Sequence, residues 1–372
     1  MKKIMVYAYT KFNLGDDLFI KILCERYPNT NFILYAPSKY KSCFKEIKNL
    51  RCFPSDSLIT RSINYFFRKC NLNNFIEKFL SKSCDGGVYI GGSLFIQGER
   101  WKEYFEQYTS TKNIKNKPFF LLGANFGPYQ EKEYYSKHKE LFSEYTDICF
   151  REKYSYEKFK DLPNVRIADD IIFQLGNSTE LIETNNIVIS VIKPSYREHL
   201  SDYDKLYFDK MKDLTIYFVE KGFNVTLTSF CEQEGDEEAI EKIMQLIPNK
   251  YKSNVKKHYY FMNIEQTVNL ISTSKYVIAS RFHAMILGWV YNKPVFPIVY
   301  SEKMTNVMED VGFQGYFIDF KNLQLITPER VLNGLKGNLL DVSNQVKNAE
   351  KHFEILDKLL VNKGRGKNEF FS

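Results

Sequence analysis

The 372-residue sequence has few of the residues that build metal and redox sites. It contains five histidines and seven cysteines. The cysteines form no CxxC pair, and none lies at metal-ligand spacing from a histidine. Their number is odd, and the first residues, MKKIMVYAYTKFNLGDD, lack the apolar stretch of a secretory signal. We therefore expect reduced thiols, a cytoplasmic protein and no bound metal.

Long apolar runs and concentrated charge are also missing. No window comes close to the roughly eighteen uncharged apolar residues that a membrane-spanning helix needs. The formal net charge of +7 is modest for this length, and the basic residues are scattered rather than gathered into the stripe of a nucleic-acid binder. We therefore expect no nucleic-acid partner. The charge fits an anionic ligand or an anionic membrane face, and any membrane contact is expected to be peripheral.

Apolar residues, by contrast, are plentiful and regularly arranged. They make up 44% of the sequence, and a chain this long exceeds what one core usually supports. Short apolar runs alternate with amphipathic stretches along nearly the whole chain, which predicts alternating strands and helices. The runs are continuous, as in parallel strands covered on both faces. The polar stretch FQLGNSTELIETNN (173–186) separates two series of such runs.

These patterns predict an α/β protein with two Rossmann-like doubly wound domains that face one another across an interdomain cleft. We expect the N-terminal domain over residues 1–178 and the C-terminal domain over residues 179–341. Residues 342–372 should form a helix that packs back on the domains, followed by a frayed tail. Doubly wound domains bind ligands where strand ends meet helix starts, so the candidate site residues lie at these turns.

The first such turn carries Asn13, Gly15, Asp16 and Asp17. It is no dinucleotide fingerprint, because the GxGxxG spacing is absent. The two aspartates could cap the following helix by accepting its free N–H groups. Alternatively, one of them points into the cleft as a general base or as a ligand for a sugar hydroxyl.

Two glycine-rich turns follow in the first series. Gly91 and Gly92, with Ser93 after them, end the run GVYI, and Asn125 lies in the turn of LLGANFGPYQ. Adjacent glycines let a ligand approach the backbone N–H groups closely. Close packing of the turn is the alternative explanation.

An arginine ends a further run of the first series. Arg151 follows DICF, and its planar fork of donors could clamp a carboxylate or a phosphate. A salt bridge to Asp169 or Glu152 is the structural alternative.

The stretch ASRFHAMILGW (279–289) combines a strand end with an apolar helix. We expect Ser280 to cap this helix and Arg281 to begin it. Arg281 and His283 would then lie on the first turn, where unpaired N–H groups and the helix dipole favour an anion. A satisfied core histidine is the alternative. After the next strand, Ser301 and Lys303 could donate to the same anion, although Lys303 could equally lie on a solvated helix face.

In their order along the chain, these motifs resemble the polysaccharide pyruvyl transferase family. The resemblance spans residues 3–312 and rests on Asn13, Gly15 and Asp16 followed by YIGGSLF, LGANFGPY, CFREKYSYEKF, ADDIIFQL, SRFHAMI and YSEKMTNVMEDVG. Family members often have a longer glycine run at the first of these motifs. They also commonly have a proline where this chain has Asp170 after Asp169.

The resemblance implies a GT-B-like pair of α/β domains and transfer of a pyruvyl group, as a ketal, from phosphoenolpyruvate to a sugar. The acceptor would belong to a capsular or exopolysaccharide, or to its lipid-linked oligosaccharide precursor at the inner membrane face. No cofactor is implied, because phosphoenolpyruvate is itself the donor substrate.

The chemistry of this reaction assigns hypothetical roles to the candidate residues. His283 is the hypothesised acid, and Asp16 or Asp17 the base. The hypothesised donor-binding residues are Arg281, Arg151, Lys303, Ser301 and Ser280. The hypothesised acceptor-binding residues are Asn13, Gly15, Gly91, Gly92, Ser93 and Asn125.

Two other functions remain open at this point. A sugar-nucleotide glycosyltransferase of the same shape would need an acidic residue to grip a ribose, a role open here to Glu302 or Glu309. A non-catalytic protein of polysaccharide assembly would tolerate the loss of Arg281 and His283.

Overall fold

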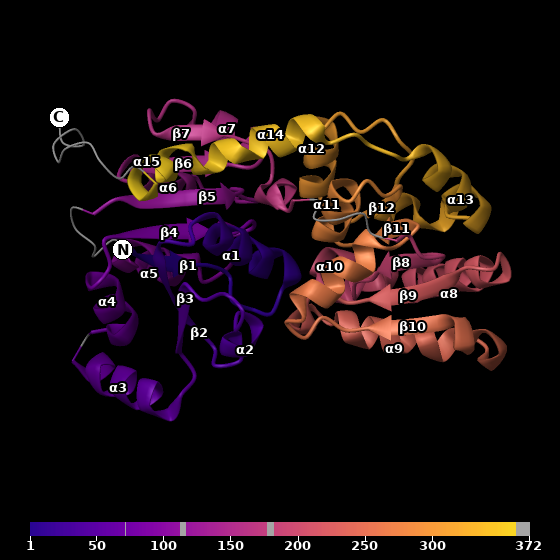
Figure 1. Ribbon diagram of the computed structural model, residues 1–372, viewed down its shortest axis with the longest axis horizontal. Coiled ribbons are helices and arrows are strands. Elements are labelled where there is room, and N and C mark those ends of the chain that lie inside the picture. Colours follow the sequence, from indigo (N-terminus) through magenta and orange to yellow (C-terminus); the bar gives the residue numbers. More distant parts are fainter. Residues whose placement is uncertain (71, 112–116, 177–181, 362–372) are drawn as a thin grey trace. The chain divides into compact units, whose positions relative to one another are not determined.

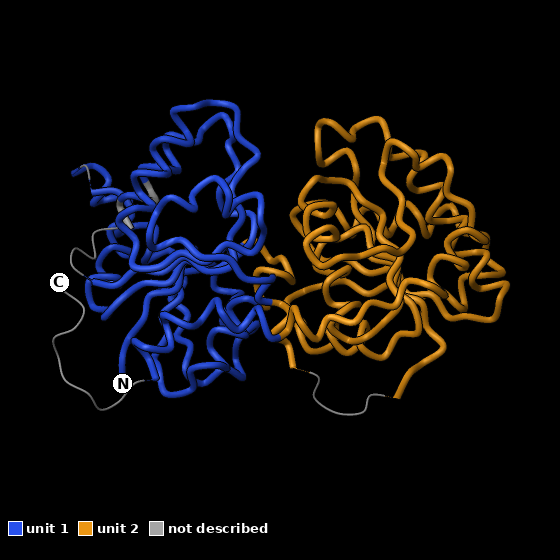
Figure 2. The backbone as a smooth tube through the Cα atoms, turned by 90° about the horizontal axis from the view of Figure 1, so that it is seen from above, with its two compact units in different colours: residues 1–10, 19–171, 347–372 blue, residues 11–18, 172–346 orange. Residues whose placement is uncertain are grey.

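A computed structural model describes residues 1–70, 72–111, 117–176 and 182–361. The chain divides into two compact units, drawn in blue and orange in Figure 2. Unit 1 comprises residues 1–10, 19–171 and 347–372, and unit 2 comprises residues 11–18 and 172–346. Among the described residues, no helix is both long and apolar enough to cross a bilayer.

Unit 1 is built on a seven-stranded parallel sheet with the order β3-β2-β1-β4-β5-β6-β7. Its strands are β1 (Lys3–Tyr7), β2 (Asn31–Ala36), β3 (Leu50–Pro54), β4 (Gly86–Ile90), β5 (Phe119–Ala124), β6 (Asp147–Phe150) and β7 (Val165–Ile167). The helices between them are α1 (Leu14–Arg26), α2 (Tyr40–Cys43), α3 (Leu58–Lys69), α4 (Phe75–Lys82), α5 (Trp101–Thr111), α6 (Lys132–Ser143) and α7 (Lys153–Phe159).

Unit 2 repeats this plan on a six-stranded parallel sheet with the order β10-β9-β8-β11-β12-β13 (Figure 1). Its strands are β8 (Asn186–Ser190), β9 (Asn224–Thr228), β10 (Val255–His258), β11 (Tyr276–Ala279), β12 (Val295–Val299) and β13 (Ile318–Asp319). Its main helices are α8 (Asp204–Glu220), α9 (Asp236–Leu246), α10 (Ile264–Ser272), α11 (Phe282–Val290), α12 (Glu302–Asp310) and α13 (Pro328–Gly337).

Both sheets have the strand order of the doubly wound nucleotide-binding fold. The order reverses between β1 and β4 in unit 1 and between β8 and β11 in unit 2. Ligands of such sheets bind at this reversal, beyond the carboxyl ends of the strands. The predicted α/β class with two doubly wound parallel sheets is therefore confirmed.

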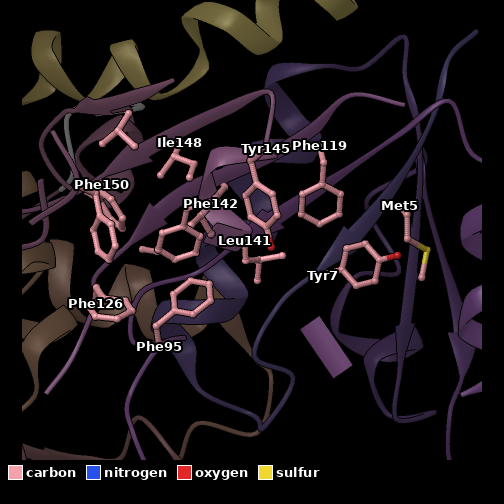
Figure 3. Close-up of a cluster of buried hydrophobic side chains, with 14 of the residues drawn as sticks. Met5, Tyr7, Phe95, Phe119, Phe126, Leu141, Phe142, Tyr145, Ile148 and Phe150 are labelled. Atoms are coloured by element: carbon pink, nitrogen blue, oxygen red, sulfur yellow. The ribbon is translucent and has the colours of Figure 1, made fainter. Parts of the chain in front are cut away.

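Aromatic side chains fill much of the core of unit 1 (Figure 3). Phe126, Phe142 and Phe159 meet edge to face, with ring centroids 4.8 Å apart for Phe126 and Phe159 and 5.1 Å apart for Phe142 and Phe159. Such pairs add stabilisation beyond the apolar area that they bury. The aromatic richness of the sequence is thus partly explained by packing.

Two edge strands, β3 and β10, are not continuous apolar runs, so the sequence pattern does not predict them. β3 (LRCFP) is mostly half-buried, and β10 (VKKH) exposes both of its lysines. Edge strands bury less of their surface, so they lack the continuous apolar run that marks a central strand.

The boundaries of the two units differ from the predicted domains. The predicted boundary at 178/179 lies outside the described residues, and the division falls between Ile171 and Ile172. Residues 11–18, predicted within the N-terminal domain, group with unit 2. The Leu14 N–H donates to the Phe230 carbonyl at 3.0 Å, and Asn13 forms a β-bridge with Cys231. This segment is held by backbone pairing that no local pattern signals.

From Lys347 the chain belongs to unit 1 again, so the boundary falls within helix α14 (Ser343–Ala349), and α15 (Glu354–Leu360) lies wholly in unit 1; both helices are yellow in Figure 1. The carboxylate of Asp357 accepts from Arg26 Nη2 and from the Tyr27 hydroxyl, both at 2.7 Å. The single helix predicted here is divided by a 3-10 turn at Glu350–Phe353. The predicted frayed tail lies outside the described residues.

Candidate active site

The candidate site in unit 2 lies at the reversal point of the sheet. The turns after β8, β9, β11 and β12 share its carboxyl edge because all of these strands are parallel. The Ser190 hydroxyl at the end of β8 accepts from the backbone N–H groups of Ser280 and Arg281, at 3.1 and 3.2 Å. This pair of bonds ties the turn that precedes α11 to the neighbouring strand.

Helix α11 begins at Phe282, one residue later than predicted. Arg281 is the N-cap residue, and no side-chain cap bond forms there. Ser280 is fully buried and accepts from the Tyr207 hydroxyl at 2.8 Å. The prediction that Ser280 caps the helix is wrong, because its hydroxyl is engaged within the core. His283 lies on the first turn of α11, as predicted, and is partly exposed.

Arg281 is buried against acidic side chains, with only 5% of its surface exposed. Its Nε donates to Asp236 Oδ2 at 2.9 Å, and its Nη1 donates to Glu234 Oε2 at 2.5 Å. Asp236 also accepts the backbone N–H groups of Phe230 and Cys231. The guanidinium of Arg281 therefore donates to carboxylates of the protein itself.

Arg197, which was not among the predicted site residues, shares this cluster. Its Nη2 donates to Glu234 Oε2 at 2.5 Å, and its guanidinium carbon lies 4.4 Å from the centre of the Tyr300 ring. Its Nη1 is buried and has no hydrogen-bond partner in the part of the chain that the structure describes. The sequence did offer a signal, since Arg197 follows the first strand of the second apolar series.

The cluster carries an excess of positive charge. Burial would raise the pKa of Glu234, but Arg281 and Arg197 outweigh this effect and lower the pKa to about 2. Burial would likewise raise the pKa of Tyr300, but Lys303, Arg197 and Arg281 hold it below its usual value. The positive potential that lowers these pKa values also favours a bound anion.

Helix α12 begins beside this cluster, with Ser301 as its N-cap residue. The Ser301 hydroxyl is buried and, among the described residues, has no hydrogen-bond partner. Lys303 Nζ lies 5.8 Å from the centre of the Tyr300 ring. Glu302 and Glu309 lie near the two ends of α12, and both are exposed.

The first turn of α1 contributes to the same region of unit 2. Asn13 Oδ1 accepts the Gly15 N–H at 3.0 Å, so Asn13 caps the helix. A Cβ atom added at Gly15 would overlap the imidazole ring of His283. Asp17 is fully buried and accepts from the Tyr260 hydroxyl at 2.5 Å, whereas Asp16 is 7% exposed.

The glycine turn after β4 packs against an arginine in unit 1. A Cβ atom added at Gly92 would lie 2.5 Å from Arg151 Nη1. Arg151 Nη2 donates to Asn125 Oδ1 at 2.7 Å, and Ser93 donates to the same oxygen at 3.3 Å. Gly91 has a φ of +148°, which favours glycine at this position.

No group of three or more His, Cys, Asp or Glu among the described residues is arranged to hold a metal ion.

A family model for polysaccharide pyruvyl transferases matches residues 13–302, well over half of the chain.

The chain belongs to the polysaccharide pyruvyl transferase family.

A relative in sequence is named for the biosynthesis of amylovoran. The amylovoran biosynthesis protein AmsJ of Erwinia amylovora is 21% identical over 315 residues, which cover 78% of this chain and 75% of that protein. Membership of the polysaccharide pyruvyl transferase family identifies the chain as a transferase.

Solved structures share the fold at low sequence identity. The UDP-GlcNAc 2-epimerase of Neisseria meningitidis, bound to UDP-GlcNAc, has a TM-score of 0.60 and 11% identity, over 97% of this chain and 100% of that chain. Anabaena Alr3699/HepE in complex with UDP has a TM-score of 0.52 and 10% identity, over 97% and 95% of the two chains. These similarities show that this pyruvyl transferase family member has a GT-B-like fold.

The departure from the family pattern at Asp170 has a structural counterpart. Arg151 Nη1 donates to Asp170 Oδ2 at 2.8 Å, and both side chains are buried. The predicted partners were Asp169 or Glu152. Asp169 instead accepts from Asn348, and Glu152 accepts from Ser155. Asp170 therefore balances the charge of Arg151 in this family member.

The structure thus separates the predicted donor-binding residues into two sets. Arg281, Ser280, Ser301 and Lys303 belong to unit 2, where His283 and Gly15 also lie. Arg151 belongs to unit 1, together with the glycine turn. Within unit 2, chemistry-bearing side chains from four strand ends share one edge of one sheet.

Proposed function

We propose that the protein transfers a pyruvyl group from phosphoenolpyruvate to a sugar of a surface glycan or of its lipid-linked precursor, forming a ketal and releasing phosphate. The observation that carries this proposal is the cluster at the carboxyl edge of the unit 2 sheet. There Arg197, Arg281 and Lys303 outnumber the carboxylates of Glu234 and Asp236. An anionic donor such as phosphoenolpyruvate suits this excess of positive charge.

Two unsatisfied polar groups support the placement of the donor. Arg197 Nη1 and the Ser301 hydroxyl are buried without hydrogen-bond partners among the described residues. Leaving a buried donor unsatisfied costs about 1–3 kcal/mol, which a bound oxyanion would recover. We assign direct contact with the carboxylate or phosphate to Arg197, Ser301 and Lys303. Arg281, which is held by Asp236 and Glu234, is assigned a positioning role.

His283 is assigned the proton transfer. It lies on the first turn of α11 and is partly exposed, so a bound ligand can reach it. A bound anion would raise the proton affinity of the imidazole, which prepares it to act as an acid. Asp17 is fully buried and holds Tyr260, so of the two aspartates we assign the base to Asp16.

The proposed reaction balances with these groups. The methylene carbon of phosphoenolpyruvate gains a proton and becomes a methyl group, while the adjacent carbon becomes electrophilic. One sugar hydroxyl adds to that carbon, phosphate leaves, and a second hydroxyl of the acceptor closes the ketal. The two hydroxyl protons replace the proton spent on the methyl group and protonate the phosphate. The cationic groups stabilise the departing charge.

The residues that bind the acceptor sugar are assigned from their position in the unit 1 sheet. Gly91, Gly92 and Ser93 follow β4 at the reversal point of the unit 1 sheet, where a doubly wound domain binds its ligand, and Ser93 donates to Asn125 at the end of the neighbouring β5. We propose that this edge binds the sugar.

One assay tests the proposal directly. The protein is incubated with phosphoenolpyruvate and a panel of galactosides, mannosides and lipid-linked oligosaccharides, and phosphate release is followed together with the mass of the sugar. We expect phosphate release only with an accepted sugar, and a matching gain of one pyruvyl group. Turnover of a nucleotide sugar, with no phosphate release from phosphoenolpyruvate, would refute it.

A further inference from the structure

Helix α3 of unit 1 exposes large apolar side chains. Leu58, Ile59 and Phe66 are 83%, 75% and 64% exposed, and Tyr65 is 53% exposed. Because residues seven apart share a helix face, Leu58 and Tyr65, and likewise Ile59 and Phe66, lie on the same side of α3, with Arg61 and Ser62 on the turn between them. Exposed apolar side chains grouped in this way mark interaction sites rather than ordinary surface.

The exposed residues lie on a properly anchored helix. Ser57 caps α3 by accepting the Thr60 N–H at 3.2 Å. On the opposite face, Phe67 stacks on Phe75 of α4 with ring centroids 3.6 Å apart. The Asn64 side chain also accepts the backbone N–H of Ile76 at 3.1 Å. α3 therefore has a separate face that holds it to α4, beside which it is drawn in Figure 1.

The charges carried by α3 itself are all positive, although Asp56, just before the helix, interacts electrostatically with Arg61. Residues 57–76 contain no acidic residue, and α3 carries Arg61, Arg68 and Lys69. Arg68 and Lys69 lie over the Tyr65 ring, at 5.6 and 4.9 Å from its centre. We define the α3 surface as the apolar residues Leu58, Ile59, Tyr65 and Phe66 together with the basic residues Arg61, Arg68 and Lys69.

An open groove beside α3 extends the positive charge. It has a volume of about 900 Å³ and is formed by residues of α3, α4 and α5 and of the turns that precede α4 and α5. Its basic residues outnumber its acidic ones; they are Arg61, Arg68, Lys78 and Arg100, against Glu103 and Glu106. An anionic headgroup would therefore be favoured both on α3 and in the groove next to it.

We propose that the α3 surface docks the protein onto an anionic lipid bilayer. An amphipathic helix that combines exposed aliphatic and aromatic side chains with arginine and lysine lies in the plane of the membrane interface. Leu58, Ile59 and Phe66 enter the boundary between headgroups and acyl chains, and the basic residues contact lipid phosphates. The inference does not depend on the reaction that the protein catalyses.

Vesicle sedimentation of the full chain tests this proposal. We expect binding to vesicles of phosphatidylglycerol and phosphatidylethanolamine, little binding to pure phosphatidylcholine, and weaker binding at high salt. The variant Leu58→Ser/Ile59→Ser/Phe66→Ser should lose about tenfold or more in binding because its apolar contact is removed. Failure of the wild-type protein to bind the anionic vesicles would overturn the proposal.

A matched variant shows whether position or mere hydrophobicity matters. Tyr316, Leu325 and Leu339 of unit 2 are also exposed, at 63%, 50% and 58%. Their triple replacement by serine should leave vesicle binding unchanged. Equal losses for both triple variants would contradict a specific role for α3. Circular dichroism should show the same helix content for both.

Charge and self-association are tested separately. Arg61→Gln/Arg68→Gln/Lys69→Gln should lose binding to anionic vesicles and most of its dependence on salt.

Light scattering then distinguishes a lipid surface from a second copy of the chain. A wild-type dimer that the apolar variant converts to a monomer, without any vesicle binding, would instead assign α3 to a protein interface.

Discussion

His283 is the residue on which the proposed chemistry depends most directly. We predict that His283→Ala lowers kcat by about a hundredfold to ten-thousandfold, the usual contribution of a general acid. The thermal midpoint should stay within about 3 °C because His283 is a partly exposed residue. Phosphate release and circular dichroism measure the two effects. A large loss of stability with residual activity would instead make His283 a structural residue.

The exposed histidine His199 provides a matched control. His199→Gln should retain wild-type activity, since His199 is a surface residue outside the proposed site. If both histidine variants lose activity to the same degree, proton transfer cannot be assigned to His283.

Arg197 should act on donor binding rather than on the chemical step. We predict that Arg197→Gln raises KM for phosphoenolpyruvate by about tenfold to a hundredfold, the value of a charge-assisted hydrogen bond. Arg330→Gln, which alters an exposed arginine of α13, should leave KM unchanged. An unchanged KM for Arg197→Gln, with a lower thermal midpoint, would restrict Arg197 to stabilising Glu234.

Gly15 tests whether the first turn of α1 positions the imidazole. A methyl group at Gly15 would overlap the His283 ring, so Gly15→Ala should displace it and lower kcat by about a hundredfold. Gly98→Ala adds the same methyl group where no atom lies within 4 Å and should have no effect. Full activity of Gly15→Ala would show that the His283 ring can move without consequence.

At the scale of elements, helix α6 carries a buried histidine that makes unit 1 sensitive to acid. Burial lowers the pKa of His138 to about 4 from its usual 6.5, although a hydrogen bond to the Tyr134 carbonyl opposes this shift. A lowered pKa means that the folded state binds the proton less tightly than the unfolded state. The stability from the neutral imidazole is therefore complete above pH 6.5 and is lost between pH 6.5 and about 4.

The lowered pKa of His138 predicts a measurable loss of unfolding free energy at acidic pH. From the two pKa values, His138 should cost about 2 kcal/mol of unfolding free energy at pH 5 relative to pH 7.5. His138→Phe, which keeps an aromatic ring among Phe95 and Phe126, should remove that part of the loss. Urea unfolding at the two pH values measures it. If His199→Gln removed the loss equally well, burial of His138 would not be its cause.

At the scale of the whole molecule, the C-terminal segment is part of unit 1. Phe353 is fully buried, and its ring centre lies 6.2 Å from the ring centre of Tyr27. The guanidinium carbon of Arg26 lies 4.8 Å from the centre of the Phe353 ring. We predict that Phe353→Ala costs about 3–5 kcal/mol. Hydrogen exchange should then accelerate in unit 1, in residues 19–26 of α1 and in β2 and β6, but not in the sheet of unit 2.

The exposed end of the same segment supplies the control. Val361→Ala, at a residue that is 62% exposed, should change neither stability nor exchange. Equal acceleration of exchange in both units for Phe353→Ala would show that the segment is not a part of unit 1 alone.

The local pattern of apolar and turn residues was enough to predict the class of the fold and the place of several candidate residues at helix starts. Central parallel strands are continuous apolar runs, and polar residues directly after them must lie at the carboxyl edge of a sheet. This placed His283, Ser301 and Lys303 correctly on helix starts. It failed for the edge strands β3 and β10, whose exposure weakens the pattern.

The sequence by itself thus determined which turns carry the candidate site residues, since each turn is a local consequence of the strand before it. Only the tertiary structure decided which charged side chains form ion pairs. Asp236 and Glu234 follow β9, Arg281 follows β11, and Arg197 follows β8, so their ion pairs depend on the order of strands in the sheet. The same holds for the backbone pairing that brings Gly15 against His283. Contacts between residues far apart in sequence have no local signature, and the packed fold alone sets them.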